Sequence, residues 1–245
     1  METILERLAP GAMEVRGTLP IHGPVVEPAA LHPVLERYGF VGREWATVLI
    51  DLRVPPEERW KKLTKGSRYD VRKAQRDGIE VSEITSEEEL KEYYGVLREA
   101  ARRNRVPPAL FGAVAESWRY VNQRYRNSIF LARHRRHIVA GLQTRTFNGV
   151  VGQGSVVTSN YGHQRRLFGM HLLAWHLIEW GHRQGGRYLD LAGVNPDAEG
   201  RSSKEAGIYF FKSRWGGELV RYKIYTKPIS ALRYGIIRRF REWRK

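Results

Sequence analysis

The chain has 245 residues, 42% of them hydrophobic, so it is long and apolar enough to bury a core, and global disorder is excluded. It contains no cysteine, which excludes disulfides, thiolate nucleophiles, iron–sulfur clusters and cysteine-bound zinc. Lys and Arg number 42 against 26 Asp and Glu, and the net charge of +16 favours anionic partners such as nucleic acid, phosphorylated substrates or an anionic membrane surface.

The first 56 residues predict a short N-terminal unit that packs on the rest of the chain, because a piece of this size cannot hold a core alone. Prolines separate its apolar segments, and we expect a helix at Leu31–Tyr38 and a strand at Trp45–Leu52. Pro55-Pro56-Glu57-Glu58 then begins a basic helix, since proline is tolerated in a first turn and acids suit its positive end. This helix runs toward Gly78, with a bend expected at Gly66.

In the middle of the chain, alternation of apolar and polar residues and strong turn signals predict a series of strands and helices. Ser86 and Glu89 form a capping box at the start of a helix, and Asn148-Gly149 is typical of a β-hairpin. The expected elements are a strand at Ile79–Ile84, helices from Glu87 to Asn104 and from Pro107 to Tyr125, and strands at Ser128–His134, His137–Phe147 and Val150–Thr158.

Leu167–Arg183 is apolar on every face and predicts a helix buried inside the fold. The order favours an α/β fold, a mixed sheet with flanking helices in which the buried helix links two parallel strands. Ligands of such sheets bind beyond the carboxyl ends of strands where the order switches, so we expect a site in the loops Ser159–Gly169 and Ala192–Ser203. The remaining elements are a strand at Tyr188–Leu191, a helix at Ser203–Arg214 and a strand at Leu219–Tyr225.

Three segments, together with this order of elements, resemble the Fem family of aminoacyl-tRNA-dependent transferases, which build the interpeptide bridge of peptidoglycan. They are Trp60–Val81, with Arg68-Tyr69-Asp70-Val71-Arg72-Lys73-Ala74 at its centre, then Leu189–Gly193, and then Gly207–Glu218, which is similar to the family's G-x-x-x-F-K-x-x-F/W-G segment. The resemblance spans about residues 45–228. It implies a GNAT-like fold, with residues 1–56 as a truncated first unit and residues 57–228 as the transferase domain. Residues 229–245 lie beyond the resemblance and are expected to form a separate helix.

Lys212 is the leading catalytic candidate. It follows four apolar or aromatic residues, and an ammonium held on such a surface can stabilise the oxyanion that forms when an amine attacks an ester or thioester. The resemblance points the same way, because the lysine of the family's F-K segment is implicated at the catalytic centre; a lysine that merely covers apolar surface is the alternative. Asp190, near a strand end, is the expected proton acceptor for the amine, or else it caps the loop that follows.

Two basic groups are expected to bind the phosphates of a donor. Arg68, Arg72 and Lys73 recur at helical spacing and suit a tRNA acceptor stem, although an ordinary solvated face has the same pattern. Arg165, Arg166 and Gly169 lie where GNAT enzymes place a pyrophosphate loop. His171 stands where that loop has a small residue, which weakens the acyl-CoA interpretation.

We place the acceptor pocket at Asn160, Tyr161, Gly193 and Phe211, of which Phe211 has core packing as its alternative role. No bound cofactor is expected, and no metal. The histidines near the buried helix, His171, His176 and His182, lack both the H-E-x-x-H order and convergent carboxylates.

The basic tail at 229–245 has apolar residues at helical spacing and predicts an amphipathic helix that docks on the domain or contacts an anionic membrane. No apolar run approaches the roughly 18 residues of a membrane span, and the first eight residues lack a signal-peptide core. We therefore expect a cytoplasmic protein, with the inner membrane surface as an additional location.

The positive charge is concentrated after residue 58. Residues 1–58 carry 5 basic and 9 acidic side chains, whereas residues 59–245 carry 37 basic and 17 acidic ones, and no acid occurs between Glu116 and Glu179. An arginine-rich solvated surface gives the same pattern. With the resemblance, this favours transfer of an amino acid from aminoacyl-tRNA to an amine of a peptidoglycan precursor or related peptide. The alternatives are a GNAT N-acyltransferase that uses acyl-CoA, and a basic module without activity that binds RNA or membrane.

Overall fold

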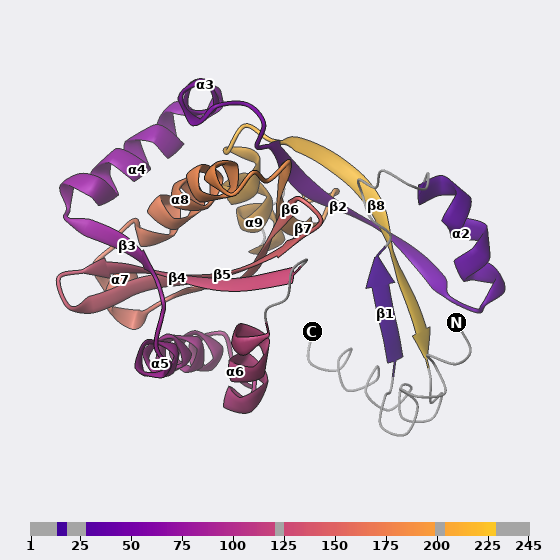
Figure 1. Ribbon diagram of the computed structural model, residues 1–245, viewed down its shortest axis with the longest axis horizontal. Coiled ribbons are helices and arrows are strands. Elements are labelled where there is room, and N and C mark those ends of the chain that lie inside the picture. The colour runs from indigo at the N-terminus through magenta and orange to yellow at the C-terminus, as the bar shows by residue number, and fades with distance from the viewer. Residues whose placement is uncertain (1–13, 19–27, 121–124, 199–203, 229–245) are drawn as a thin grey trace. The chain divides into compact units, whose positions relative to one another are not determined.

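The computed structural model describes residues 14–18, 28–120, 125–198 and 204–228, and it has the α/β architecture that the sequence predicts (Figure 1). The helix expected at 229–245 lies outside the described residues. In chain order the elements are β1 (Glu14–Thr18), α2 (Pro28–Arg37), β2 (Val41–Asp51), α3 (Pro56–Lys62), α4 (Lys65–Arg76), β3 (Ile79–Glu83), α5 (Glu87–Arg103), α6 (Phe111–Arg119), β4 (Tyr125–His134), β5 (His137–Phe147), β6 (Val150–Thr158), α7 (Asn160–Gln164), α8 (Gly169–Arg183), β7 (Tyr188–Val194), α9 (Lys204–Ser213) and β8 (Glu218–Pro228).

The strands form one mixed sheet in the order β1-β8-β2-β7-β6-β5-β4-β3. β3, β4, β5 and β6 are an antiparallel meander, and β6 then pairs in parallel with β7 across the α8 crossover, as expected. The β5–β6 hairpin turns at Asn148 and Gly149, whose φ angles of +49° and +75° belong to the left-handed region that Asn and Gly tolerate best.

The described chain divides into two compact units. The smaller unit holds β1, α2, the first part of β2, residues 195–197 and the described chain from residue 220. Within it β1 pairs with β8, and His32 shares a hydrogen bond with the hydroxyl of Tyr225. The larger unit holds residues 47–194 and 198–219, apart from those that are not described. The domain boundaries taken from the resemblance stay a prediction.

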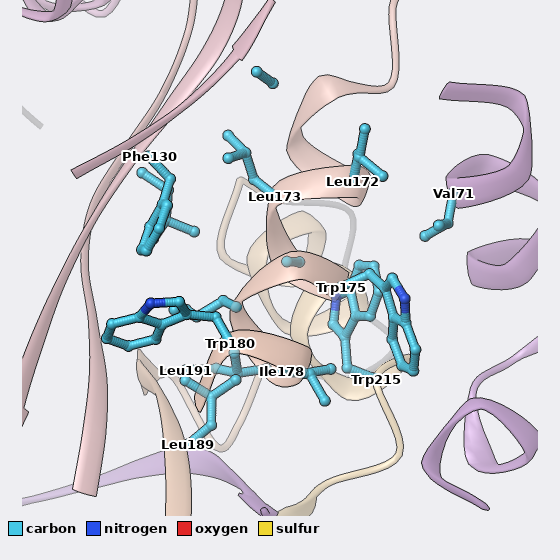
Figure 2. Close-up of a cluster of buried hydrophobic side chains, with 14 of the residues drawn as sticks. Val71, Phe130, Leu172, Leu173, Trp175, Ile178, Trp180, Leu189, Leu191 and Trp215 are labelled. Atoms are coloured by element: carbon cyan, nitrogen blue, oxygen red, sulfur yellow. The ribbon is translucent and has the colours of Figure 1, made fainter. Parts of the chain in front are cut away.

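α8 is the central helix of the larger unit. It packs on β4, β5 and β6 with one side and on α4 and α3 with the other, while α5 and α6 cover the opposite face of the sheet (Figure 1). A helix between two layers needs apolar residues all round, which explains its composition. Figure 2 shows the result: Trp180 meets Phe130 from the sheet, with ring centroids 5.2 Å apart, and Trp175 lies with Trp215 on the other side.

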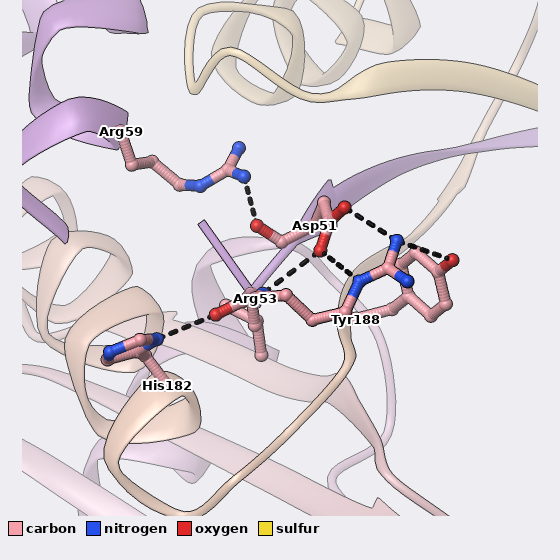
Figure 3. Close-up of polar contacts among 6 residues, drawn as sticks. Asp51, Arg53, Arg59, His182 and Tyr188 are labelled. Atoms are coloured by element: carbon pink, nitrogen blue, oxygen red, sulfur yellow. Dashed lines mark hydrogen bonds and ion pairs between the residues drawn. The ribbon is translucent and has the colours of Figure 1, made fainter. Parts of the chain in front are cut away.

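The end of β2 is tied to the start of β7 and to α8 (Figure 3). Asp51 accepts two hydrogen bonds from the guanidinium of Arg53, at 2.9 and 2.7 Å, and the side-chain bond to Arg53 lowers the pKa of Asp51 to about 2. The buried Arg59 donates to the carbonyl of Asp51, and His182 hydrogen-bonds the carbonyl of Leu52 at 2.7 Å. Arg53 also donates to the hydroxyl of Tyr188 at 3.2 Å, and the Leu52 amide donates to the Arg187 carbonyl at 2.9 Å. These last two bonds hold the end of β2 beside the start of β7, the strand that carries the site described below.

Several details differ from the sequence prediction. β1 was not expected; the predicted helix that reaches Tyr125 ends at Arg119, and β4 begins at Tyr125 instead of Ser128. The single helix expected toward Gly78 is two helices, because Leu63 is extended and Thr64 caps α4 by accepting from the Ser67 amide at 3.2 Å.

The buried helix begins at Gly169 instead of Leu167, and the short α7 precedes it. Ser159 caps α7 by accepting from the amide of Gly162 at 3.0 Å. Gly162 and Gly169 both press on β5: a Cβ atom at either would lie within 2.6 Å of an atom of Val139. None of the described helices is both long and apolar enough to cross a bilayer.

Candidate functional site

β6 and β7 are hydrogen-bonded to each other only over their first three residues. Their parallel pairing runs from Val150 opposite Tyr188 to Gly152 opposite Asp190. On the other side of β6 the register shifts, because Leu142 pairs with Val156 while Thr144 pairs with Gln153, so β6 carries a bulge at 154–155. The two strands therefore separate at their carboxyl ends, where open α/β sheets bind ligands.

A cavity of about 1050 Å³ lies at this separation. Within the larger unit its walls come from β6, the 159–169 loop, the first turn of α8, β7 and α9. Apolar side chains of Leu167, Phe168, Ile208 and Phe211 alternate with polar and basic ones on the wall. Among its described lining residues are no Asp or Glu, and such a wall suits a ligand with an apolar part and negative or electron-rich oxygens.

Lys212 projects from α9 into this wall and is only 8% exposed. Its Nζ donates to the carbonyls of Ala192 and Gly193, each at 3.0 Å, just beyond the point where the strands part. An ammonium has three N–H donors, and no third partner lies among the described residues, so one donor remains for a ligand. Burial lowers the pKa of Lys212 to about 8, against the opposing field of Asp190, so the side chain stays largely charged at neutral pH.

Asp190 shapes the strand end that holds Lys212. Its Oδ1 accepts from the amide of Ala192 at 2.8 Å and from the hydroxyl of Thr47 on β2. Ala192 has a φ of +63°, a strained value for a residue with a side chain, and the Asp190 bond to its amide supports that turn. Asp190 is not among the cavity-lining residues, so its contacts match the loop-capping alternative.

A second polar cluster lies behind the same wall. Asp70 of α4 accepts from Arg214 at 2.8 Å and lies 3.4 Å from Nε2 of His171. The ring of His171 packs edge-on against Phe168 and Phe211 and lines the cavity. Burial lowers the pKa of His171 to about 4, with Arg214 acting in the same direction and Asp70 against it, so the imidazole is neutral at pH 7.

The predicted donor-binding residues do not converge on one place. Arg166 lines the large cavity, and with Arg165 and Lys73 it also lines a second cavity of about 550 Å³. In contrast, Arg68 donates to the Leu63 carbonyl at 2.5 Å, and Arg72 lies over the ring of Trp60. Neither Arg68 nor Arg72 lines either cavity, and Gly169 is buried against β5.

The predicted acceptor residues also separate. Phe211 lines the large cavity, and Gly193 contributes the carbonyl that holds Lys212. Asn160 instead accepts from Arg103 at 2.8 Å, and the hydroxyl of Tyr161 bonds to His134 at 2.8 Å. The catalytic and binding roles of all these residues stay predictions.

Thr47, Asp70, Gln153 and Arg214 were not among the residues predicted for the site, and His171 was expected only to weaken acyl-CoA binding. Only Asp70 and Arg214 had a signal, since both lie inside the segments that carry the resemblance. In the described part of the chain, no three His, Asp or Glu side chains are grouped to hold a metal ion.

The architecture just described is a GNAT-like fold, and it is similar to several solved structures. The crystal structure of FemX matches with a TM-score of 0.66 and 12% identity over 91% of this chain and 75% of that chain. L-PGS from Bacillus licheniformis matches with a TM-score of 0.55 and 15% identity over 85% of this chain and 68% of that chain.

A tandem GNAT protein from the clavulanic acid biosynthesis pathway matches with a TM-score of 0.50 and 17% identity, covering 89% of this chain and 63% of that chain. No family model and no curated protein sequence matches the chain. The predicted α/β, GNAT-like fold is confirmed by these matches between structures.

Proposed function

We propose that the protein is a Fem-like aminoacyltransferase that moves an amino acid from aminoacyl-tRNA to the amine of a peptidoglycan precursor or a related peptide. The observation that carries this proposal is the buried ammonium of Lys212, held by two β7 carbonyls at the wall of a large cavity. The sequence resemblance to the Fem family selects the same lysine. The high net positive charge of +16 suits a polyanionic donor.

The chemistry follows from the position of this ammonium. The acceptor amine attacks the ester carbonyl carbon, and the carbonyl oxygen becomes an oxyanion as the new C–N bond forms. The remaining N–H of Lys212 stabilises that oxygen inside a wall that lowers the local dielectric constant. When the intermediate collapses, the C–O bond to the ribose breaks, and the leaving ribose oxygen takes up the proton that the amine releases.

The tRNA donor is favoured over acyl-CoA by His171. Its ring lies in the first turn of α8 between Phe168 and Phe211, so it occupies space on the approach to the helix start where GNAT enzymes bind a pyrophosphate. A tRNA terminus needs only its last nucleotide and its aminoacyl ester in the cavity, while the exposed side chains of Arg165 and Arg166 remain for backbone phosphates.

The test supplies the protein separately with aminoacyl-tRNA and with acyl-CoA, each with peptidoglycan-precursor peptides and small amines as acceptors. We expect a new amide product with aminoacyl-tRNA only, detected by mass spectrometry and abolished by ribonuclease treatment of the donor. RNA binding should also weaken steeply with salt. Product from acyl-CoA that is insensitive to ribonuclease would replace the proposal with an N-acyltransferase. RNA or membrane binding without product from either donor would replace it with a binding module.

A further inference from the structure

Gln153 has a side-chain oxygen, Oε1, that is buried and that forms no hydrogen bond with the described residues. The residue as a whole is 8% exposed. Burying an unpaired amide oxygen is unfavourable, and most buried polar atoms in proteins are paired. An unpaired one on a cavity wall therefore indicates a group that binds a ligand.

Gln153 stands at the place where the two strands separate. It directly follows Gly152, the last β6 residue paired with β7, and it lines the same cavity as Lys212. Lys212 is held by the carbonyl of Ala192, two residues beyond Asp190 on the neighbouring strand. Gln153 and Lys212 therefore line one cavity from different elements, Gln153 from the end of the paired part of β6 and Lys212 from α9.

These two groups have complementary hydrogen-bonding capacity. Lys212 can only donate, which suits a carbonyl oxygen, whereas Oε1 of Gln153 can only accept, which suits an N–H. An aminoacyl ester carries both partners on adjacent carbons, its carbonyl oxygen and its α-amino group. A simple acyl group has only the carbonyl. A carboxylate on this wall would oppose the positive charge of Lys212, whereas a neutral amide accepts a hydrogen bond without adding a negative charge to the cavity.

We propose that Gln153 binds the α-amino group of the transferred aminoacyl group and so determines that the enzyme accepts aminoacyl rather than plain acyl donors. This assignment rests on the proposed aminoacyl transfer and adds to it the residue that reads the donor. Gln153 positions and selects the donor, while Lys212 acts on the reacting carbonyl.

The test uses two stable probes, which are RNA stem-loops ending in CCA whose 3′-terminal amino-deoxyadenosine carries either alanine or propionate through an amide bond. The probes differ only in the α-amino group. We expect the wild-type protein to bind the alanyl probe roughly 10- to 100-fold more tightly in calorimetry, as for a hydrogen bond to a charged group. Gln153→Met keeps the length of the side chain and should bind both probes equally. Gln75→Met, on the exposed face of α4, is the matched control and should keep the wild-type preference.

Thermal unfolding supplies a second readout. Because Gln153→Met removes a buried oxygen that has no described partner, its unfolding midpoint should equal or exceed that of the wild type. A preference that survives in Gln153→Met, or a wild type that binds the two probes equally or binds neither, overturns the assignment. If the wild type transfers an aminoacyl group but Gln153→Met still prefers the alanyl probe, the role of Gln153 is wrong and the proposed function stands. If Gln153→Met loses the preference for the alanyl probe but the wild type transfers no aminoacyl group, the proposed function is wrong and the role of Gln153 in binding stands.

Discussion

Replacing Lys212 with methionine is expected to lower the turnover number by roughly 100- to 1000-fold, the usual loss when one donor to an oxyanion is removed. Methionine keeps the bulk of the side chain, so the cavity wall formed with Phe211 stays filled while the charge is lost. The loss should fall on kcat, with the binding of the donor little changed, because the ammonium interacts most strongly with the charge of the transition state. Steady-state kinetics with the donor that supports transfer provides the measurement.

Lys91→Met is the matched control, since Lys91 is exposed on α5 and lines neither cavity. It should retain wild-type turnover. A Lys212→Met protein that folds normally and keeps full turnover contradicts the catalytic assignment, and Lys212 is then a lysine that only packs between α9 and β7.

Replacing Asp70 with alanine is expected to lower the free energy of unfolding by about 3 kcal/mol or more. The side chains of Asp70 and Arg214 are only 12% and 14% exposed, and their contact joins α4 to the end of α9. Without the carboxylate, the guanidinium of Arg214 remains largely buried without its counter-ion, and His171 loses its partner as well. Urea unfolding of the wild type and the variant at pH 7 measures the difference.

An exposed ion pair gives the comparison. Glu83 bonds to Arg126 at 2.8 Å, but the Arg126 side chain is 47% exposed, so Glu83→Gln should change the free energy of unfolding by less than about 1 kcal/mol. Equal losses in the two variants would mean that the Asp70 cluster is no more important to stability than a surface pair.

Local sequence signals were sufficient for much of the fold. The Asn148-Gly149 hairpin and the apolar helix before Gly185 each have one dominant cause, a left-handed turn in one case and burial on every side in the other. The strand-to-helix connection after Ser159 could not be predicted, because α7 has only five residues and depends on the packing of Gly162 against Val139. The pairing partner of β1 likewise lies far away along the chain, in β8.

In the candidate site, too, residues with a local sequence signal could be predicted, whereas residues brought together only by the fold could not. Lys212 was found because the F-K segment is continuous in sequence, and it does line the cavity. Thr47 could not be found, since it sits in an apolar strand and meets Asp190 only across 143 residues of chain. Gln153 belongs to no sequence motif. It could be recognised only from the structure, in which it follows the last β6 residue paired with β7 and its buried side-chain oxygen has no described partner.

The central claim is that a positive charge at residue 212, and not merely its bulk, promotes the transfer. The chain has no cysteine, so Lys212→Cys creates one thiol that can be alkylated alone. Treatment with 2-bromoethylamine then places an ammonium at nearly the original distance from the backbone, whereas treatment with bromopropane adds a neutral chain of similar length.

The turnover number of these two adducts, measured beside that of unmodified Lys212→Cys, tests the claim most directly. We predict that Lys212→Cys is nearly inactive, that aminoethylation restores a substantial part of wild-type turnover and that propylation restores none. Equal rescue by both reagents, or no rescue by the ammonium in a protein whose circular dichroism and unfolding midpoint match those of the propyl adduct, would contradict it.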